Sequence, residues 1–438
     1  MTLGISMSGT QGARTAADLS GLYRKISWRL LPLLLLCYSF AYLDRVNIGF
    51  AKLQMQADVG LSDAAYGLGA GIFFLGYVLF EIPSNLLLVR VGARRTICRI
   101  MVLWGLTSAC MLFVRDEYSF YALRFLLGVF EAGFAPGMIF YLTYWYSSRR
   151  MAGVMAVVMC AGPLGGMLGG PLSAWIMTRF SGAHGLDGWQ WMFLLEGLPC
   201  VLLGVAAFFG LADRPEQANW LSARERALLA DDLRQRQDTH STHAFRDVLR
   251  DPGIYALAIP YFCLISGIYA VSFWLPTLLQ AAGIRDTMQI GIWSAVPYVA
   301  AIAAMFLLSR RSDRLRERRW HVAAPAIVAG VSLAAALATP QYFVLSMALL
   351  VLATALMWAA YTVFWAVPSQ HLKGPAAAGG IALINSIGLL GGFASPTLIG
   401  WVKTATQSLN GGLYVISGLL IVGVLPILFT RHARVQQG

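Results

Sequence analysis

Twelve apolar runs, each about as long as a lipid bilayer is thick, constrain this chain more than any other feature. A helix that crosses a bilayer needs about 20 predominantly apolar residues. The runs are 30–50, 66–89, 98–114, 118–146, 152–178, 190–211, 253–282, 289–309, 322–338, 342–366, 376–402 and 411–430. The longest runs fit a membrane if they tilt or extend beyond the lipid. The pattern predicts an all-α membrane protein with about 12 transmembrane helices.

The composition agrees with a surface that faces lipid. Apolar residues make up 58% of the 438 residues and charged residues 12%, whereas a soluble globular domain has roughly 25% charged residues. A chain of this length with so little charge cannot expose its whole surface to water. The polar first 29 residues precede an apolar run that lacks the cleavage site of a signal peptide, so we expect the first span to be retained.

Lysine and arginine are distributed unevenly between alternate loops. With the N-terminus inside, 26 of the 33 basic residues fall in inward segments. The outward segments contain only Arg115, Arg179, Arg285 and Lys403. This asymmetry predicts a multi-pass protein with both termini in the cytoplasm. The net charge of +12 therefore indicates orientation in the bilayer rather than binding of nucleic acid.

A polar stretch at 213–250 divides the spans into two sets of six. We expect a cytoplasmic N-terminal segment (1–29), an N-terminal six-helix bundle (30–212), a cytoplasmic linker (213–250), a C-terminal six-helix bundle (251–430) and a cytoplasmic tail (431–438). Within the linker, Ser222 and Glu225 have the spacing of a capping box and predict the start of a helix.

The two halves of the chain are related in sequence. The Gly165-Gly166 pair recurs as Gly391-Gly392, and Trp175 recurs as Trp401, each 226 residues later. Repeats of six helices build many secondary transporters, with the substrate site between the halves. Because small residues let helices approach closely in lipid, the glycines predict either static close packing or an interface that moves.

Charged residues inside the predicted spans carry most of the chemical information. They are Asp44, Arg45, Glu81, Arg124, Glu131 and Glu196. Each costs at least ~2.5–3.5 kcal/mol at a helix centre and needs a partner or a water-filled cavity. Arg124 and Glu131 share a helix face but lie ~10.5 Å apart along the axis. We therefore expect their partners on another helix, where Asp44 and Arg45 are the candidates.

These residue types suit the transport of an anion with protons. Arginine binds carboxylates through two parallel hydrogen bonds, and a carboxyl group beside it can gain and lose a proton. We predict that Asp44 and Glu131 carry protons and that Arg45 and Arg124 bind the anion. The alternative is an ion-pair network that only holds helices together. Further candidates for contact with the solute, or equally for packing, are Tyr42, Tyr77, Tyr361, Thr362, Trp365 and Asn385.

Five stretches carry a resemblance to a known family. They are 42–47, 81–85, 124–134, 189–199 and 382–388. Over roughly 25–430 the chain resembles the major facilitator superfamily, and more narrowly the anion:cation symporter family of bacterial tartrate, sugar-acid and phthalate permeases. The resemblance implies the major facilitator fold and uptake of a small carboxylate by proton symport across the cell inner (plasma) membrane. It also implies that Tyr77 and Asn385 contact the substrate.

The alternative function on the same fold is export of metabolites or drugs by proton antiport. The intramembrane arginines favour an anionic solute but do not set the direction of transport. The cysteines and histidines lack metal-ligand spacing, and no nucleophile–base motif is present. We therefore expect no enzymatic activity, no catalytic or metal-binding residue and no cofactor. The expected partners of this monomer are the organic anion, protons and the lipid bilayer.

Overall fold

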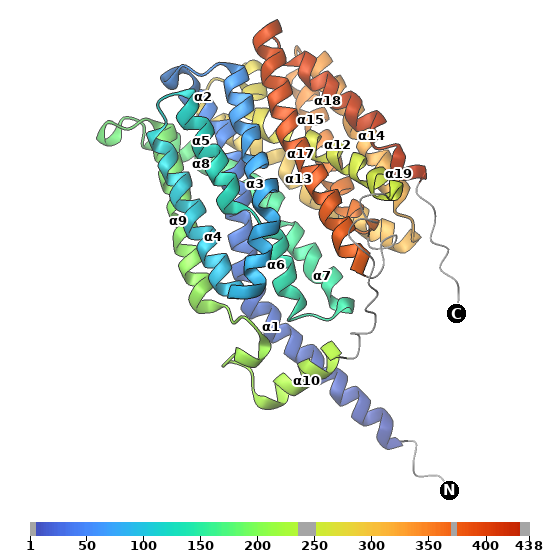
Figure 1. The fold of residues 1–438 in the computed structure, drawn as a ribbon. Coiled ribbons are helices and arrows are strands. Elements are labelled where there is room, and N and C mark those ends of the chain that lie inside the picture. The colour runs from blue at the N-terminus through green and yellow to red at the C-terminus, as the bar shows by residue number, and fades with distance from the viewer. Residues whose placement is uncertain (1–5, 235–250, 369–374, 430–438) are drawn as a thin grey trace.

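The structure is a computed structural model that describes residues 6–234, 251–368 and 375–429 (Figure 1). Within these ranges the chain forms helices and no strands. The N-terminal half contains α1 (Ser6–Val46), α2 (Ile48–Val59), α3 (Asp63–Val91), α4 (Ala93–Cys110), α5 (Glu117–Glu131), α6 (Phe134–Thr143), α7 (Ser148–Met159), α8 (Ala161–Arg179) and α9 (Gly188–Gly210), followed by α10 (Ala223–Arg234). The C-terminal half contains α12 (Pro252–Ala281), α13 (Thr287–Leu315), α14 (Arg319–Ala338), α15 (Phe343–Phe364), α17 (Pro375–Thr406), α18 (Asn410–Val422) and α19 (Pro426–Phe429).

The helices confirm the prediction of about 12 spans. Twelve helical segments of the described chain are long and apolar enough to cross a membrane. The first, Asp18–Val59, combines α1 with α2, and the last, Asn410–Phe429, combines α18 with α19. The short run at 322–338 lies within α14, whose 20 residues match the thickness of a bilayer.

The fourth span is broken directly after an acidic residue. α5 ends at Glu131 and α6 begins at Phe134. Between them, Gly133 adopts a φ of +82°, which residues with a side chain rarely adopt. A Cβ atom on Gly133 would also lie 2.8 Å from the Cβ of Ser84 on α3. The glycine therefore ends α5 and places the buried Glu131 at the C-terminus of this helix.

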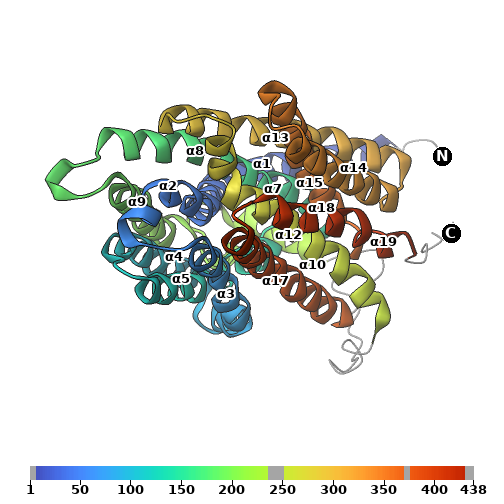
Figure 2. The same cartoon turned by 90° about the horizontal axis from the view of Figure 1, so that it is seen from above.

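Glycines hold the two halves together along two helix pairs, α3 with α17 and α8 with α13 (Figure 2). A Cβ atom on Gly67 of α3 would lie 2.3 Å from the carbonyl oxygen of Pro396 on α17. A Cβ atom on Gly170 of α8 would lie 2.8 Å from the carbonyl oxygen of Gly291 on α13. Such close backbone contact requires residues without side chains. The glycine-rich runs therefore pack one half against the other.

The halves are joined at one end of the bundle and in its middle. We call the end opposite α10 and the start of α1 the distal end (Figure 1). At the distal end, the Lys403 ammonium donates to the carboxylate of Asp63 at 3.0 Å. Closer to the other end, the Asn385 amide donates to Glu81 at 2.8 Å. These two contacts join the halves at different depths, and the one between Lys403 and Asp63 holds the distal end together.

The helix α10 packs beneath the N-terminal half (Figure 1). The backbone N–H of Ser222 donates to the Glu225 carboxylate at 2.8 Å, and the N–H of Glu225 donates to the Ser222 hydroxyl at 3.2 Å. This confirms the predicted capping box. Lys25 of α1 also donates to Glu225 at 2.9 Å. The remaining predicted linker residues, 235–250, and the predicted tail lie outside the described residues.

Candidate functional site

Arg45 and Glu131 form a buried ion pair between the first and fourth spans. Arg45 lies in the last turn of α1, and Glu131 is the last residue of α5. The Nη2 of Arg45 donates to Glu131, and its Nη1 donates to the Tyr269 hydroxyl on α12 at 2.6 Å. Exposure is 7% for Arg45 and 1% for Glu131. Because Tyr269 belongs to the C-terminal half, this ion pair lies where the two halves meet.

Arg124 lies two turns before Glu131 on α5 and is fully buried. Its Nε and Nη2 donate to the carbonyl oxygens of Gly69 and Ala70 on α3, both at 3.2 Å. As the sequence predicts, the hydrogen bonds of Arg124 go to another helix. The described bonds do not include one to Asp44, which the sequence offers as a candidate partner. The backbone carbonyls of α3 take its place as partners.

One aromatic ring lies close to the guanidinium groups of both arginines. The Cζ atoms of Arg45 and Arg124 each lie 5.2 Å from the centroid of the Phe73 ring. A guanidinium at this distance is attracted by the π-electrons of the ring. Arg45 also lies 5.6 Å from the ring of Tyr77. The predicted cations and Tyr77 are therefore gathered around a common aromatic surface on α3.

Asp44 is buried beside this ion pair and accepts three hydrogen bonds. The donors are the indole of Trp104 at 2.5 Å, the hydroxyl of Ser108, and the amide of Asn47 at 3.2 Å. Trp104 and Ser108 both belong to α4 and lie one turn apart. The residues predicted to carry protons and to bind the anion, Asp44 included, thus come together in the N-terminal half.

Asn47 also joins Asp44 to Glu196, a second buried acid. The Asn47 amide donates to Glu196 at 2.9 Å, and the Ser173 hydroxyl donates to it at 2.8 Å. Replacing Asn47 with alanine should lower the melting temperature of the purified protein, because both carboxylates lose a donor, at about 1–3 kcal/mol per group. The exposed Asn410→Ala should leave the melting temperature unchanged. Equal melting temperatures for both variants would contradict the bridging role of Asn47.

Glu81 and Asn385 connect the halves on the side of the ion pair away from the distal end. The amide of Asn385 on α17 donates to Glu81 of α3 at 2.8 Å and accepts from the Tyr261 hydroxyl at 3.3 Å. Tyr261 packs against Tyr361 and Trp365, with ring centroids 6.0 Å and 4.9 Å away. Three of the predicted contact residues thus share one cluster in the C-terminal half.

The hydroxyl groups of two other predicted contact residues form hydrogen bonds within the protein. The Thr362 hydroxyl donates to the Trp358 carbonyl of its own helix at 2.9 Å. The Tyr42 hydroxyl bonds to the Ser272 hydroxyl on α12 at 3.1 Å, and Tyr298 donates to the same Ser272 at 3.0 Å. Tyr42 therefore joins the halves, whereas Thr362 is satisfied locally.

Several buried polar atoms around the ion pair have no hydrogen-bond partner among the described residues. They are Nε of Arg45, Nη1 of Arg124, Oε2 of Glu131, Oε2 of Glu81 and Oδ1 of Asn47. Most buried polar groups in proteins are paired. Free guanidinium N–H groups in a buried site are suited to bind a carboxylate. No cluster of metal-ligating side chains occurs in the described part of the chain.

The residues that complete the site give weak signals in the sequence. Tyr269 and Tyr261 lie in an apolar span, where a tyrosine that packs looks the same as one that bonds an arginine. Trp104 and Ser108 have only their one-turn spacing in common. Asn47 offers the clearest signal, since it lies three residues after Asp44, on the same helical face.

The described chain has twelve membrane-length helices in two halves, and buried charges lie where the halves meet. This arrangement is typical of secondary transporters, which bind their substrate between two helical bundles. A family model described as Major Facilitator Superfamily matches residues 34–396. The chain belongs to this family. Its relatives are transporters and not enzymes.

Curated relatives resemble the chain over nearly its full length. A protein of Pseudomonas putida that is named as a metabolite transport protein, NicT, is 46% identical over 93% of this chain and 94% of its own. A protein of Agrobacterium vitis that is named as a tartrate transporter is 46% identical over 95% and 96%. The quinolone resistance transporter of Acinetobacter baumannii is 39% identical over 94% and 95%.

A solved structure supports the same fold. The bacterial homolog to the human lysosomal transporter Spinster, in an inward-facing and occupied conformation, superimposes with a TM-score of 0.70. The match covers 93% of this chain and 95% of that chain at 15% sequence identity. At this identity the comparison confirms the major facilitator fold predicted from the sequence and says nothing about the solute.

Proposed function

We propose that the protein takes up a small carboxylate together with protons by alternating access. The observation that carries the proposal is the arrangement of Arg45, Arg124, Asp44 and Glu131 in one buried site at the junction of the halves. Two permanent cations lie there beside two acids that can exchange protons. A site of this kind binds an anion and responds to protonation at the same place.

The direct bond between Arg45 and Glu131 suggests how the two events are coupled. While Glu131 is ionised, its carboxylate occupies the Nη2 group of Arg45. Protonation of Glu131 removes the charge that holds the guanidinium and frees it for the carboxylate of a solute. Asp44, held by Trp104, Ser108 and Asn47, balances the charge of Arg124 in this scheme. Each solute would thus require at least one proton.

The C-terminal half supplies neutral groups to the proposed site. Tyr269 bonds Arg45, and Asn385 with Tyr361 and Trp365 lies further from the distal end. Hydroxyl and amide groups can bond the hydroxyls of a hydroxy acid, whereas the N-terminal half would bind its charge. The tartrate-transporter name of one relative agrees with a substrate of this chemical class.

We place the protein in the inner membrane of a bacterial cell, with the distal end facing outward. The positive-inside distribution supports both termini in the cytoplasm. Within this orientation the contact between Lys403 and Asp63 lies on the outer side and would help to close it. Alternating access would open this contact and close the other side.

Uptake into proteoliposomes tests the proposal. Radiolabelled tartrate should enter faster when the outside is more acidic by one pH unit than when the gradient is absent. It should accumulate up to about tenfold for each proton carried, since one pH unit is worth about 1.4 kcal/mol. A proton ionophore should abolish the acceleration. An uptake rate that changes neither with the gradient nor with the ionophore would contradict proton symport.

Export is the second candidate function, because one relative is named as a quinolone resistance transporter. In that case protons move opposite to the solute. An acidic interior should then drive uptake into the vesicles, and an acidic exterior should slow it. The sign of the gradient that accelerates tartrate uptake therefore decides between symport and antiport.

A further inference from the structure

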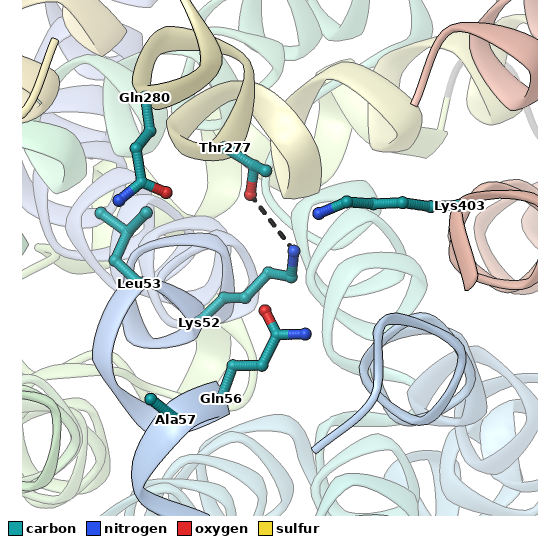
Figure 3. A pocket seen from close by; sticks show the side chains of 7 residues that line it. All are labelled: Lys52, Leu53, Gln56, Ala57, Thr277, Gln280 and Lys403. Carbon is teal, nitrogen blue, oxygen red and sulfur yellow. Dashed lines mark hydrogen bonds between the residues drawn. The ribbon is translucent and has the colours of Figure 1, made fainter. Parts of the chain in front are cut away.

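The distal end contains a second group of charges, away from the central site. Lys52 of α2 and Lys403 of α17 line a hollow of about 260 Å³ together with Thr277 and other side chains of both halves (Figure 3). The Lys52 ammonium donates to the Thr277 hydroxyl at 3.5 Å. In Figure 3 the ammonium group of Lys403 points toward the same space. The described lining contains no acidic residue.

One carboxylate serves both lysines. Asp63, the first residue of α3, contacts the ammonium of Lys52 at 2.7 Å and that of Lys403 at 3.0 Å through the same oxygen atom. Aromatic rings surround the rest of Lys52, whose ammonium lies 4.3 Å from the Trp274 ring and 5.0 Å from the Tyr66 ring. The group therefore has two cations and one anion, a surplus of one positive charge.

The three residues are divided between the halves. Lys52 and Asp63 belong to the N-terminal half, and Lys403 belongs to the C-terminal half. If the halves separate at the distal end, Asp63 stays with Lys52 because both are held by adjacent helices. Lys403 then loses its carboxylate while it still lines the opening. An unpaired ammonium at this position attracts an anion.

We propose that Lys403 forms a distal anion site, where the carboxylate of an arriving solute takes the place of Asp63 while Asp63 stays with Lys52. This inference rests on the proposed transport of a carboxylate. Asp63 competes with the solute for the same ammonium group. Return of Asp63 to Lys403 releases the solute toward the central arginines and closes the distal end behind it.

A simple latch between the halves would use the same residues but respond differently to mutation. For a latch, Lys403→Gln removes one of the two ion pairs of Asp63 and Asp63→Asn removes both, so the two variants should change the KM in the same direction. For an anion site the two variants act oppositely, because one removes an attracting charge and the other removes the competitor. The direction of the change in apparent affinity therefore separates the two roles.

Tartrate uptake by intact bacterial cells shows whether the KM rises or falls in each variant, since the solute reaches the distal end from outside. We expect Lys403→Gln to raise the KM about fivefold, the effect of one solvated charge pair at about 4 Å. We expect Asp63→Asn to lower the KM by a similar factor, even though loss of the ion pair slows turnover. Both changes should shrink in high salt. The control Arg285→Gln removes an exposed charge from the same face and should leave the KM unchanged.

Bromide tests the site without transport. Crystals of the purified Asp63→Asn protein soaked in bromide should show an anomalous peak between the ammonium groups of Lys52 and Lys403. The double variant Asp63→Asn/Lys403→Gln should show none. A KM that moves in the same direction in both single variants, or a missing bromide peak in Asp63→Asn, would overturn the distal anion site. Failure of the wild type to carry tartrate would count against the proposed function alone, because the bromide result would still decide this inference.

Discussion

Glu131→Gln is expected to abolish accumulation of the solute against its gradient while exchange of solute across the membrane continues. Glutamine keeps the shape of Glu131 and an oxygen that can accept from Arg45, but it cannot carry a proton. We expect gradient-driven uptake to fall at least about a hundredfold, within the range by which removal of an acid–base group slows proton transfer. Counterflow in vesicles preloaded with solute should stay within about threefold of the wild type, since it needs no net proton movement.

Two controls make this result specific. Glu117 is the first residue of the same helix and is exposed at the distal end, so Glu117→Gln should transport normally. Alanine at 131 is unsuitable, because unlike glutamine it also removes the oxygen that accepts from Nη2 of the buried Arg45 and leaves a cavity. Full coupled uptake by a well-folded Glu131→Gln protein would remove Glu131 from the mechanism.

Gly67→Ala is expected to slow transport strongly without preventing insertion into the membrane. The added Cβ would lie 2.3 Å from the carbonyl oxygen of Pro396 and 3.0 Å from the Cα of Gly400. These are backbone atoms of α17, which cannot rotate away as a side chain does. Only separation of α3 from α17 relieves the contact, so the distal end should stay open. We expect the uptake rate to fall at least about tenfold, the scale of a barrier raised by 1.4 kcal/mol.

The matched control is Gly418→Ala on α18, where no atom lies within 4 Å of the added Cβ. Alanine is a better helix former than glycine by about 1 kcal/mol, so this variant should be at least as stable as the wild type and equally active. Uptake rates are compared at equal amounts of protein in the membrane. Wild-type uptake by Gly67→Ala would show that the halves need not pack this closely during the cycle.

The sequence predicts the spans well because a bilayer imposes a length and an apolar composition on every helix that crosses it. It also predicts that the partner of Glu131 lies on the first span, because the spacing of seven residues excludes a direct pair with Arg124. The structure identifies that partner as Arg45. The roles of these residues in proton coupling and binding stay predictions.

Other contacts of the site have no pattern that a single sequence displays. Arg124 bonds to the backbone carbonyls of Gly69 and Ala70, and every residue has a carbonyl. Glu81 and Asn385 are 304 residues apart, so no helical periodicity relates them. Such pairs depend on how the helices pack, which the pattern of apolar residues does not determine.

The C-terminal half contributes only neutral side chains, among the described residues, to the contacts at the middle of the bundle. Its rotation against the other half therefore moves no fixed charge through the electric field at the centre of the bilayer. A membrane voltage then acts mainly on the cargo, at about 2.3 kcal/mol per elementary charge for each 100 mV. The voltage dependence of the rate should consequently report the number of protons carried minus the negative charges of the solute.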